Sequence, residues 1–242
     1  MSTLRANPAP APSPGDVRQM VIHACDVARS AASAVGDAIS SGSSNLFELI
    51  RQREEELDAL DRQINEAVTV AISRVPEEEA RDLLACLKLV IELERIGDLL
   101  LHFANRARTV AARLESNDVR DLTAMASILE KMLADATAAF AQRDVKLAIE
   151  VLRADSELDR LRNLLLVRHI ENPEAAHRTE SFHVVFMSQT LERAGDHTKN
   201  IAEEVVFLVT KRSARHAMRA SEKPYEEMWA DWMRKKERDR RS

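Results

Sequence analysis

Four pairs of acidic residues have the spacing that metal chemistry on a helix requires. The pairs are Glu54 and Asp58, Glu94 and Asp98, Asp155 and Asp159, and Glu192 and Asp196. A separation of four positions places both carboxylates on one helix face, with their Cβ atoms about 5–6 Å apart. Like charges at that distance repel each other, so a pair that is present in both halves of the chain is expected to attract a cation. We interpret the eight acids as candidate metal ligands.

The pair Glu94 and Asp98 interrupts an apolar stripe. Leu87 and Ile91 share with it an arc of roughly 80° on a helix that turns by about 100° per residue. Charge in such a stripe is costly unless it is paired or bound to a metal. Oxygen ligands favour Mg, Mn, Ca or Fe, and zinc also accepts carboxylates. The opposing interpretation is an ordinary solvated acid, or an ion pair between Glu94 and an arginine such as Arg95.

A glycine precedes the aspartate in two of these pairs, Gly97 before Asp98 and Gly195 before Asp196. Glycine weakens a helix interior by about 1 kcal/mol relative to alanine. Its presence predicts that another backbone or a bulky ligand approaches the helix closely at these two points.

The elements that must position these residues are helices. The 242 residues include only 5 glycines and 7 prolines, and aromatic residues make up 4%. These numbers are too low for the turns and strands of a β-sandwich, a barrel or a doubly wound α/β fold. Apolar residues recur at helical spacing, and Asn45 is a candidate N-cap. The sequence predicts six helices, at about 16–39, 46–74, 76–114, 116–142, 144–171 and 173–211.

The second half of the chain repeats the first. Residues 93–98 (LERIGD) recur at 191–196 (LERAGD), residues 56–58 (ELD) at 157–159, and residues 76–77 (PE) at 173–174. We therefore expect an all-α fold of two tandem three-helix bundles, 16–115 and 116–212, related by an approximate internal twofold axis. A disordered arm rich in Pro and Ala is expected over 1–15, and a basic extension that contains aromatic residues over 213–242.

Charge and motifs exclude several classes of function. The chain has 35 Lys and Arg against 40 Asp and Glu, a net charge of −5, which argues against a nucleic-acid partner. Its 2 cysteines match no metal motif, and neither a leader nor a membrane-spanning run is found, so we expect a cytoplasmic protein. No nucleophile triad or glycine-rich phosphate loop is present. Glu174 with His177 and Glu180 with His183 have the di-iron spacing but share one helix, which we interpret as coincidence.

The segments LERIGD (93–98) and LERAGDHTKNIAEEVVFLV (191–209), each on the third helix of a repeat, resemble the PhoU family of phosphate-uptake regulators. The resemblance covers about residues 16–212 and implies two three-helix bundles. Some family members bind multinuclear iron or zinc clusters through the acidic motifs. The positions that match those motifs are Glu54, Asp58, Glu94, Asp98, Asp155, Asp159, Glu192 and Asp196, all of them acidic here.

The same resemblance implies a regulator and not an enzyme. It would be a cytoplasmic negative regulator of phosphate-starvation signalling that associates with the membrane. Its expected partners are the ATPase subunit of the phosphate-specific ABC transporter and a sensor histidine kinase, and we also expect a homodimer. The residues themselves leave two alternatives open, a carboxylate-bridged di-metal enzyme and a metal-free helical scaffold whose acids form ion pairs.

The C-terminal extension is a departure from the shorter family members. Tyr225, Trp229 and Trp232 follow helical spacing and precede the basic cluster 234–236. Such a segment could dock on a partner helix or make a peripheral contact with an anionic membrane. It could equally pack back onto the bundle.

Overall fold

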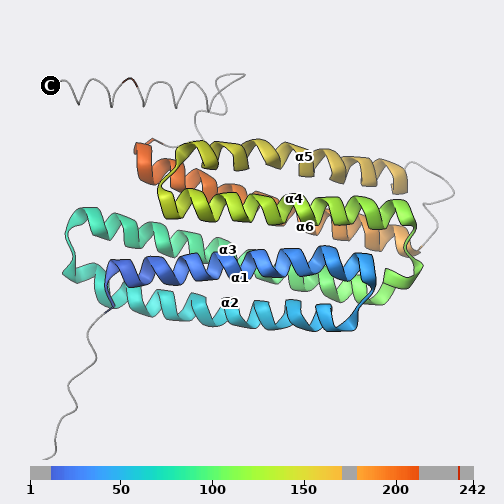
Figure 1. The fold of residues 1–242 in the computed structure, drawn as a ribbon, viewed down its shortest axis with the longest axis horizontal. Coiled ribbons are helices and arrows are strands. Elements are labelled where there is room, and N and C mark those ends of the chain that lie inside the picture. The colour runs from blue at the N-terminus through green and yellow to red at the C-terminus, as the bar shows by residue number, and fades with distance from the viewer. Residues whose placement is uncertain (1–11, 171–178, 213–233, 235–242) are drawn as a thin grey trace, which may run out of the picture.

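The computed structural model describes residues 12–170 and 179–212, together with Arg234, and this part of the chain contains helices and no strand (Figure 1). The six helices are α1 Pro14–Ser41, α2 Ser44–Ala71, α3 Glu77–Val110, α4 Ser116–Gln142, α5 Val145–Ile170 and α6 Thr179–Thr210. Short 3₁₀ turns, Ile72–Arg74 and Ala111–Arg113, follow α2 and α3. None of the described helices is long and apolar enough to cross a membrane. The all-α prediction is confirmed.

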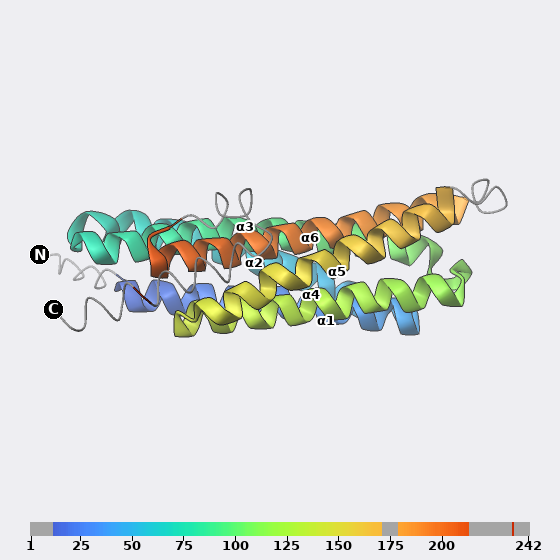
Figure 2. The same ribbon diagram turned by 90° about the horizontal axis from the view of Figure 1, so that it is seen from above.

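The helices form two three-helix bundles that lie side by side along a common long axis (Figures 1 and 2). Helices α1, α2 and α3 pack together in the first bundle, and α4, α5 and α6 in the second. The bundles meet along two seams, α1 against α4 and α3 against α6, whereas α2 and α5 lie on the outside. The predicted pair of three-helix bundles is therefore confirmed.

Small side chains meet at one end of the seam between α1 and α4. A Cβ built on Gly36 would lie 3.5 Å from Ala126 Cβ, and Ser40 Oγ lies 3.0 Å from Thr123 Oγ1. At the other end of the seam, Arg18 Nη2 donates to the carbonyl oxygen of Phe140 at 3.3 Å. The start of α1 thus lies beside the end of α4, and the two helices run antiparallel.

The first inter-helix turn is shorter than the sequence suggested. Gly42 adopts a left-handed conformation with φ 67° and ends α1, which only glycine does without strain. The chain reverses over Gly42 and Ser43, so α2 begins at Ser44 with Ser43 in the N-cap position. The prediction that Asn45 caps this helix is wrong, since Asn45 lies within α2. The predicted start of the last helix, at residue 173, lies outside the described residues.

Candidate metal centre

In the first bundle, α2 and α3 approach each other closely at Gly97. A Cβ built on this glycine would lie 2.7 Å from Leu57 Cδ1 and 3.8 Å from the Cα of Glu54. Leu57 is fully buried, so it occupies the space that a larger residue at position 97 would need. The close approach inferred from the sequence is therefore that of the neighbouring helix, and Gly97 lets α2 and α3 lie side by side at the acidic motifs.

This approach brings two acidic pairs together as the first acidic cluster, formed by Glu54 and Asp58 of α2 and Glu94 and Asp98 of α3. Burial raises the pKa of Glu54 above its usual value, and repulsion from Asp58 and Asp98 raises it further. Burial likewise raises the pKa of Glu94, with added repulsion from Asp98 and Asp58. The carboxylates of the two helices thus repel one another across the α2–α3 groove.

The positive charges next to the first acidic cluster lie at its edge. Arg95 Nε is 3.5 Å from Glu94 Oε2, and Arg62 Nη1 is 3.8 Å from Asp58 Oδ2. The arginine side chains are 62% and 66% exposed. Exposed pairs at such distances are screened by water and contribute little. The cluster therefore keeps an excess of negative charge.

The second bundle repeats the same helix contact. A Cβ built on Gly195 of α6 would collide with Leu158 Cδ1 of α5, as at Gly97. The second acidic cluster consists of Asp155 and Asp159 of α5 and Glu192 and Asp196 of α6. Its environment differs, because Lys199 Nζ donates a hydrogen bond to Asp155 Oδ2 and Arg162 Nη2 donates to Glu192 Oε1 at 3.1 Å.

These two basic side chains alter the electrostatics of the second acidic cluster. Burial raises the pKa of Asp155, and Lys199 opposes that rise without cancelling it. Burial also raises the pKa of Glu192, and Arg162 opposes it. For Lys199 itself, burial acts to lower the pKa, but the hydrogen bond and charge of Asp155 outweigh it, so the pKa is raised overall. The ammonium stays charged and neutralises part of the cluster.

Lys199 and Arg162 were missed by the sequence analysis. The corresponding positions of the first repeat are Leu101, in the alignment of the LERIGD and LERAGD motifs, and Asp61, in the alignment of the two ELD motifs. That alignment was the signal that could have revealed them. In the second repeat, a basic residue stands three positions after the aspartate of each motif. The first repeat has a neutral or an acidic residue at these two positions.

The acidic clusters are facing pairs and not closed cages. Among the described residues, no three carboxylate, imidazole or thiolate side chains converge closely enough to hold a metal ion. The first cluster nevertheless suits a hard cation, since its candidate ligands are all carboxylate oxygens. Their negative charge is not neutralised by a buried basic side chain. The second cluster fits a cation less well, because Lys199 already binds Asp155. Metal binding at the eight acids stays a prediction.

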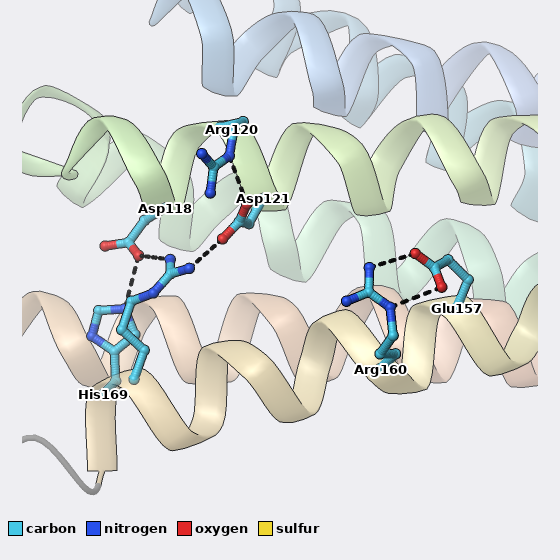
Figure 3. A network of polar contacts seen from close by, with 7 residues as sticks. Asp118, Arg120, Asp121, Glu157, Arg160 and His169 are labelled. Carbon is cyan, nitrogen blue, oxygen red and sulfur yellow. Dashed lines mark hydrogen bonds and ion pairs between the residues drawn. The ribbon is translucent and has the colours of Figure 1, made fainter.

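A buried polar network at one end of the second bundle was also missed (Figure 3). Arg168 of α5 donates to Asp118 Oδ1 at 3.0 Å and to Asp121 Oδ2 at 2.5 Å, both on α4. His169 Nε2 lies 2.9 Å from Asp118 Oδ1, and its Nδ1 lies 3.0 Å from Ser181 Oγ of α6. These groups satisfy one another, so we interpret the network as a clamp that joins three helices.

The remaining candidate residues lie apart from the acidic clusters. Glu180 Oε1 is 3.3 Å from Arg113 Nε, an ion pair that does not involve His183. Glu174 and His177 lie outside the described residues, as does the aromatic part of the C-terminal extension. His197 follows Asp196 in the sequence and is not one of the candidate ligands. Its Nδ1 is 2.6 Å from Glu92 Oε2 of α3, so it contributes to the seam between the bundles.

Comparisons with known proteins agree on one family. The family model described as PhoU domain matches the chain twice, at residues 21–107 and 122–205. The phosphate-specific transport system accessory protein PhoU homolog of Pseudomonas aeruginosa is 33% identical over 193 residues, which cover 75% of this chain and 78% of that protein. The homolog of the same name from Zymomonas mobilis is 29% identical over 202 residues, covering 81% and 84%.

Solved structures give the same result at the level of the fold. The crystal structure of PhoU from Pseudomonas aeruginosa matches with a TM-score of 0.73 and 28% identity, covering 82% of this chain and 97% of that one. The phosphate transport system regulatory protein PhoU from Streptococcus pneumoniae matches with a TM-score of 0.73, 20% identity, and coverage of 83% and 96%.

Proposed function

This chain belongs to the PhoU family, and from that premise we propose that it is a non-enzymatic, metal-binding regulator of phosphate uptake. The names of its relatives, accessory proteins of the phosphate-specific transport system, support the role in phosphate uptake. The duplicated acidic clusters support metal binding. In each cluster, a glycine lets two helices approach closely, so that the acids of both helices face each other. The proposal therefore assigns the regulatory role to the helical framework and the metal to its two acidic grooves.

The observation that most supports metal binding is the unneutralised negative charge of the first acidic cluster. Burial and mutual repulsion raise the pKa of Glu54 and of Glu94, and the neighbouring arginines are exposed. Repelling carboxylates in a groove are stabilised by a bound cation, which supplies the positive charge that they lack. We assign the eight acids as ligands, with the first cluster as the tighter site. Iron and zinc are the metals that the family suggests, and Mg, Mn and Ca also suit oxygen ligands.

The partners belong to the same proposal. An accessory protein of the transport system is expected to contact the transporter, and we assign this contact to the ATPase subunit of the ABC transporter. Negative regulation would then pass to a sensor histidine kinase, with the regulator acting as a homodimer in the cytoplasm. A peripheral membrane contact through residues 213–242 rests on the amino-acid sequence alone, since these residues lie outside the described part apart from Arg234.

A metal-free scaffold is the competing function that specific contacts favour. Lys199 binds Asp155 and Arg162 binds Glu192, so the second acidic cluster already contains counter-charges. If the first cluster were similarly satisfied by Arg95 and Arg62, neither cluster would need a metal. The two proposals differ in the metal content of the purified protein.

The test is metal analysis of protein purified without chelator, with Asp98→Asn and Asp196→Asn as variants. Asparagine keeps the shape of the side chain and removes the charge. We expect Asp98→Asn to remove most of the bound metal and Asp196→Asn to remove less, because Lys199 already neutralises the second cluster. Asp135→Asn is a suitable control, since Asp135 pairs with Lys131 on α4, a helix that carries none of the eight acids. Equal metal content in all four proteins would contradict the proposal.

A further inference from the structure

A cleft of 530 Å³ opens on the seam between the bundles, lined by residues of α3 and α6. These two helices lie side by side in Figure 2. The cleft lies toward the end of α3 and the beginning of α6, apart from the α2–α3 and α5–α6 grooves that hold the acidic clusters. Its volume falls within the range of sites for small organic ligands, about 300–1,000 Å³. The cleft is thus large enough to hold more than a single inorganic ion.

The register of the two helices determines which side chains line the cleft. Arg106 of α3 stacks on the ring of Phe186 of α6, with its Cζ 4.5 Å from the ring centroid. Because the helices are antiparallel, residues one turn further along α3 face residues one turn earlier on α6. The lining includes two arginines, two histidines and two apolar side chains: Arg106, Arg193, His102, His183, Leu99 and Phe186.

The charged side chains that line the cleft are both arginines. Arg106 and Arg193 each lack an ion-pair partner within the described part of the chain, and no carboxylate is among the lining residues. Arg106 Cζ lies over the Phe186 ring, and this contact with the ring does not use the N–H groups of the guanidinium as hydrogen-bond donors to another side chain. His183 Nδ1 is shielded from solvent and has no hydrogen-bond partner among the described residues. These groups therefore have hydrogen-bonding capacity that the protein itself does not use.

At the opposite end of the α3–α6 seam, a basic side chain is neutralised by an acid. There Lys88 Nζ lies 3.0 Å from both Oε1 and Oε2 of Glu204. When the two repeats are aligned on their LERIGD and LERAGD motifs, Lys88 corresponds to Phe186 and Glu204 corresponds to Arg106. One end of the seam thus has a lysine–glutamate pair, and the other has an arginine on an aromatic ring. Positive charge is left uncompensated only at the cleft end of this matched pair.

We propose that this cleft binds a small organic phosphate. Guanidinium groups match the geometry of phosphoryl oxygens and donate two hydrogen bonds in one plane. Arg106 and Arg193 would hold the phosphoryl group, with His102 and His183 beside it. Leu99 and the exposed edge of Phe186 form the apolar part of the lining, against which the organic portion of the ligand packs. This site needs no metal and does not depend on the acidic clusters.

The test is calorimetric titration of the full-length protein after removal of metal with a chelator. The probes are adenosine monophosphate, ribose 5-phosphate and inorganic phosphate. At least one ester is expected to bind more tightly than inorganic phosphate, which lacks the portion that packs on Leu99 and Phe186. Arg193→Gln and Arg106→Gln are each expected to reduce the affinity about ten-fold or more, as the loss of a charge-assisted hydrogen bond does.

Arg108→Gln is the matched control, because Arg108 lies on α3 two residues from Arg106, is exposed and does not line the cleft. It is expected to leave the affinity unchanged. Arg193 is itself exposed, so Arg193→Gln tests the proposal even if Arg106→Gln unfolds the protein. The proposal is overturned if no probe binds or if Arg193→Gln binds as tightly as the unaltered protein. Inorganic phosphate binding as tightly as both esters would overturn the assignment of an organic ligand.

Discussion

Lys199 is the residue that most clearly distinguishes the two acidic clusters. Its ammonium group binds the buried Asp155, whereas the first repeat has Leu101 at the corresponding position. Leucine offers no charge, so apart from the exposed Arg95 and Arg62 at its edge the first cluster depends on solvent or a bound cation for its counter-charge. A single substitution between the repeats thus separates a cluster that is partly satisfied from one that is not.

Lys199→Leu makes the second cluster resemble the first and tests this difference. We expect the metal-free variant to lose about 2–3 kcal/mol of stability, because Asp155 is left buried without its cation. The loss is smaller than for a fully buried pair, since the Lys199 side chain is 23% exposed. Addition of a divalent metal should restore more stability to the variant than to the unaltered protein. Urea unfolding with and without metal measures both effects.

The pH dependence of that loss follows from the raised pKa of Asp155. In the variant this pKa rises further above the ordinary value of 3.8, because burial is then opposed by no lysine. The folded state therefore holds its proton more tightly than the unfolded chain, and stability falls as the pH rises through the folded pKa. The variant should be most destabilised at neutral pH and approach the unaltered protein below about 3.8. A loss that does not change with pH would contradict this account.

Lys131→Leu is the control for the loss of a lysine. Lys131 pairs with Asp135 on α4, but its side chain is 72% exposed. Exposed ion pairs contribute about 0–1 kcal/mol. The control is therefore expected to change stability little at any pH, and to respond to metal as the unaltered protein does.

At the scale of helices, Gly97 and Gly195 determine how closely the acidic motifs approach each other. At both glycines a leucine of the neighbouring helix fills the space of the missing side chain. The acids on either side of that leucine then face the acids beside the glycine. Close helix packing and the formation of an acidic cluster are consequently produced by the same residues.

Gly97→Ala tests this coupling. The new Cβ would lie 2.7 Å from Leu57 Cδ1, and Leu57 is buried with little room to move. Overpacking costs about 1–3 kcal/mol, and the gain in helix propensity recovers about 1 kcal/mol. We expect a net loss of about 1 kcal/mol, together with weaker metal binding at the first cluster only. Unfolding and metal titration of the variant measure these two effects.

Gly36→Ala is the matched control on α1. Its Cβ would make an ordinary contact, 3.5 Å from Ala126 Cβ, so the alanine should stabilise the protein by up to about 1 kcal/mol. If the two variants were equally stable, the close approach at Gly97 would have no energetic consequence and the coupling would fail.

The helices show which parts of the fold the sequence could predict. Their number and order follow from apolar periodicity, which depends on residues three and four positions apart. The start of α2 was wrong by two residues because the left-handed Gly42 shortens the turn. The clamp between Arg168 and Asp118 could not be predicted at all, since it joins residues 50 positions apart that carry no local signal.

The same limit applies to the candidate site. The acidic pairs were identified from their spacing, because i, i+4 partners share a helix face whatever the tertiary structure. The glycines before Asp98 and Asp196 predicted a close approach, and the structure shows that it is the packing of α2 on α3 that brings Glu54 near Asp98. The role of Lys199 was not expected, because a basic residue on a helix is usually solvated and only the α5–α6 contact places it at Asp155.

At the scale of the whole molecule, the two bundles share one continuous apolar core that includes buried residues of all six helices. Helix α1 shows the consequence most clearly. Of its 28 residues, 13 are buried, among them consecutive pairs such as Ala24 and Cys25 or Ala31 and Ala32. That is more than a single face of a helix provides, and it arises because α1 packs on α2 and α3 on one side and on α4 on the other.

This shared core predicts that the repeats do not fold separately, although each has three helices. Residues 1–115 alone would expose the α1 and α3 surfaces that normally cover α4 and α6, which are large apolar patches. We expect this fragment, and likewise residues 116–242, to unfold without a cooperative transition and to bind a hydrophobic dye. The full-length protein should instead unfold in one transition, and mixing the two fragments should restore it. Separate cooperative unfolding of each fragment would show that the α1–α4 and α3–α6 seams join two independent domains, and the shared core would then be a consequence of their docking and not a condition for their folding.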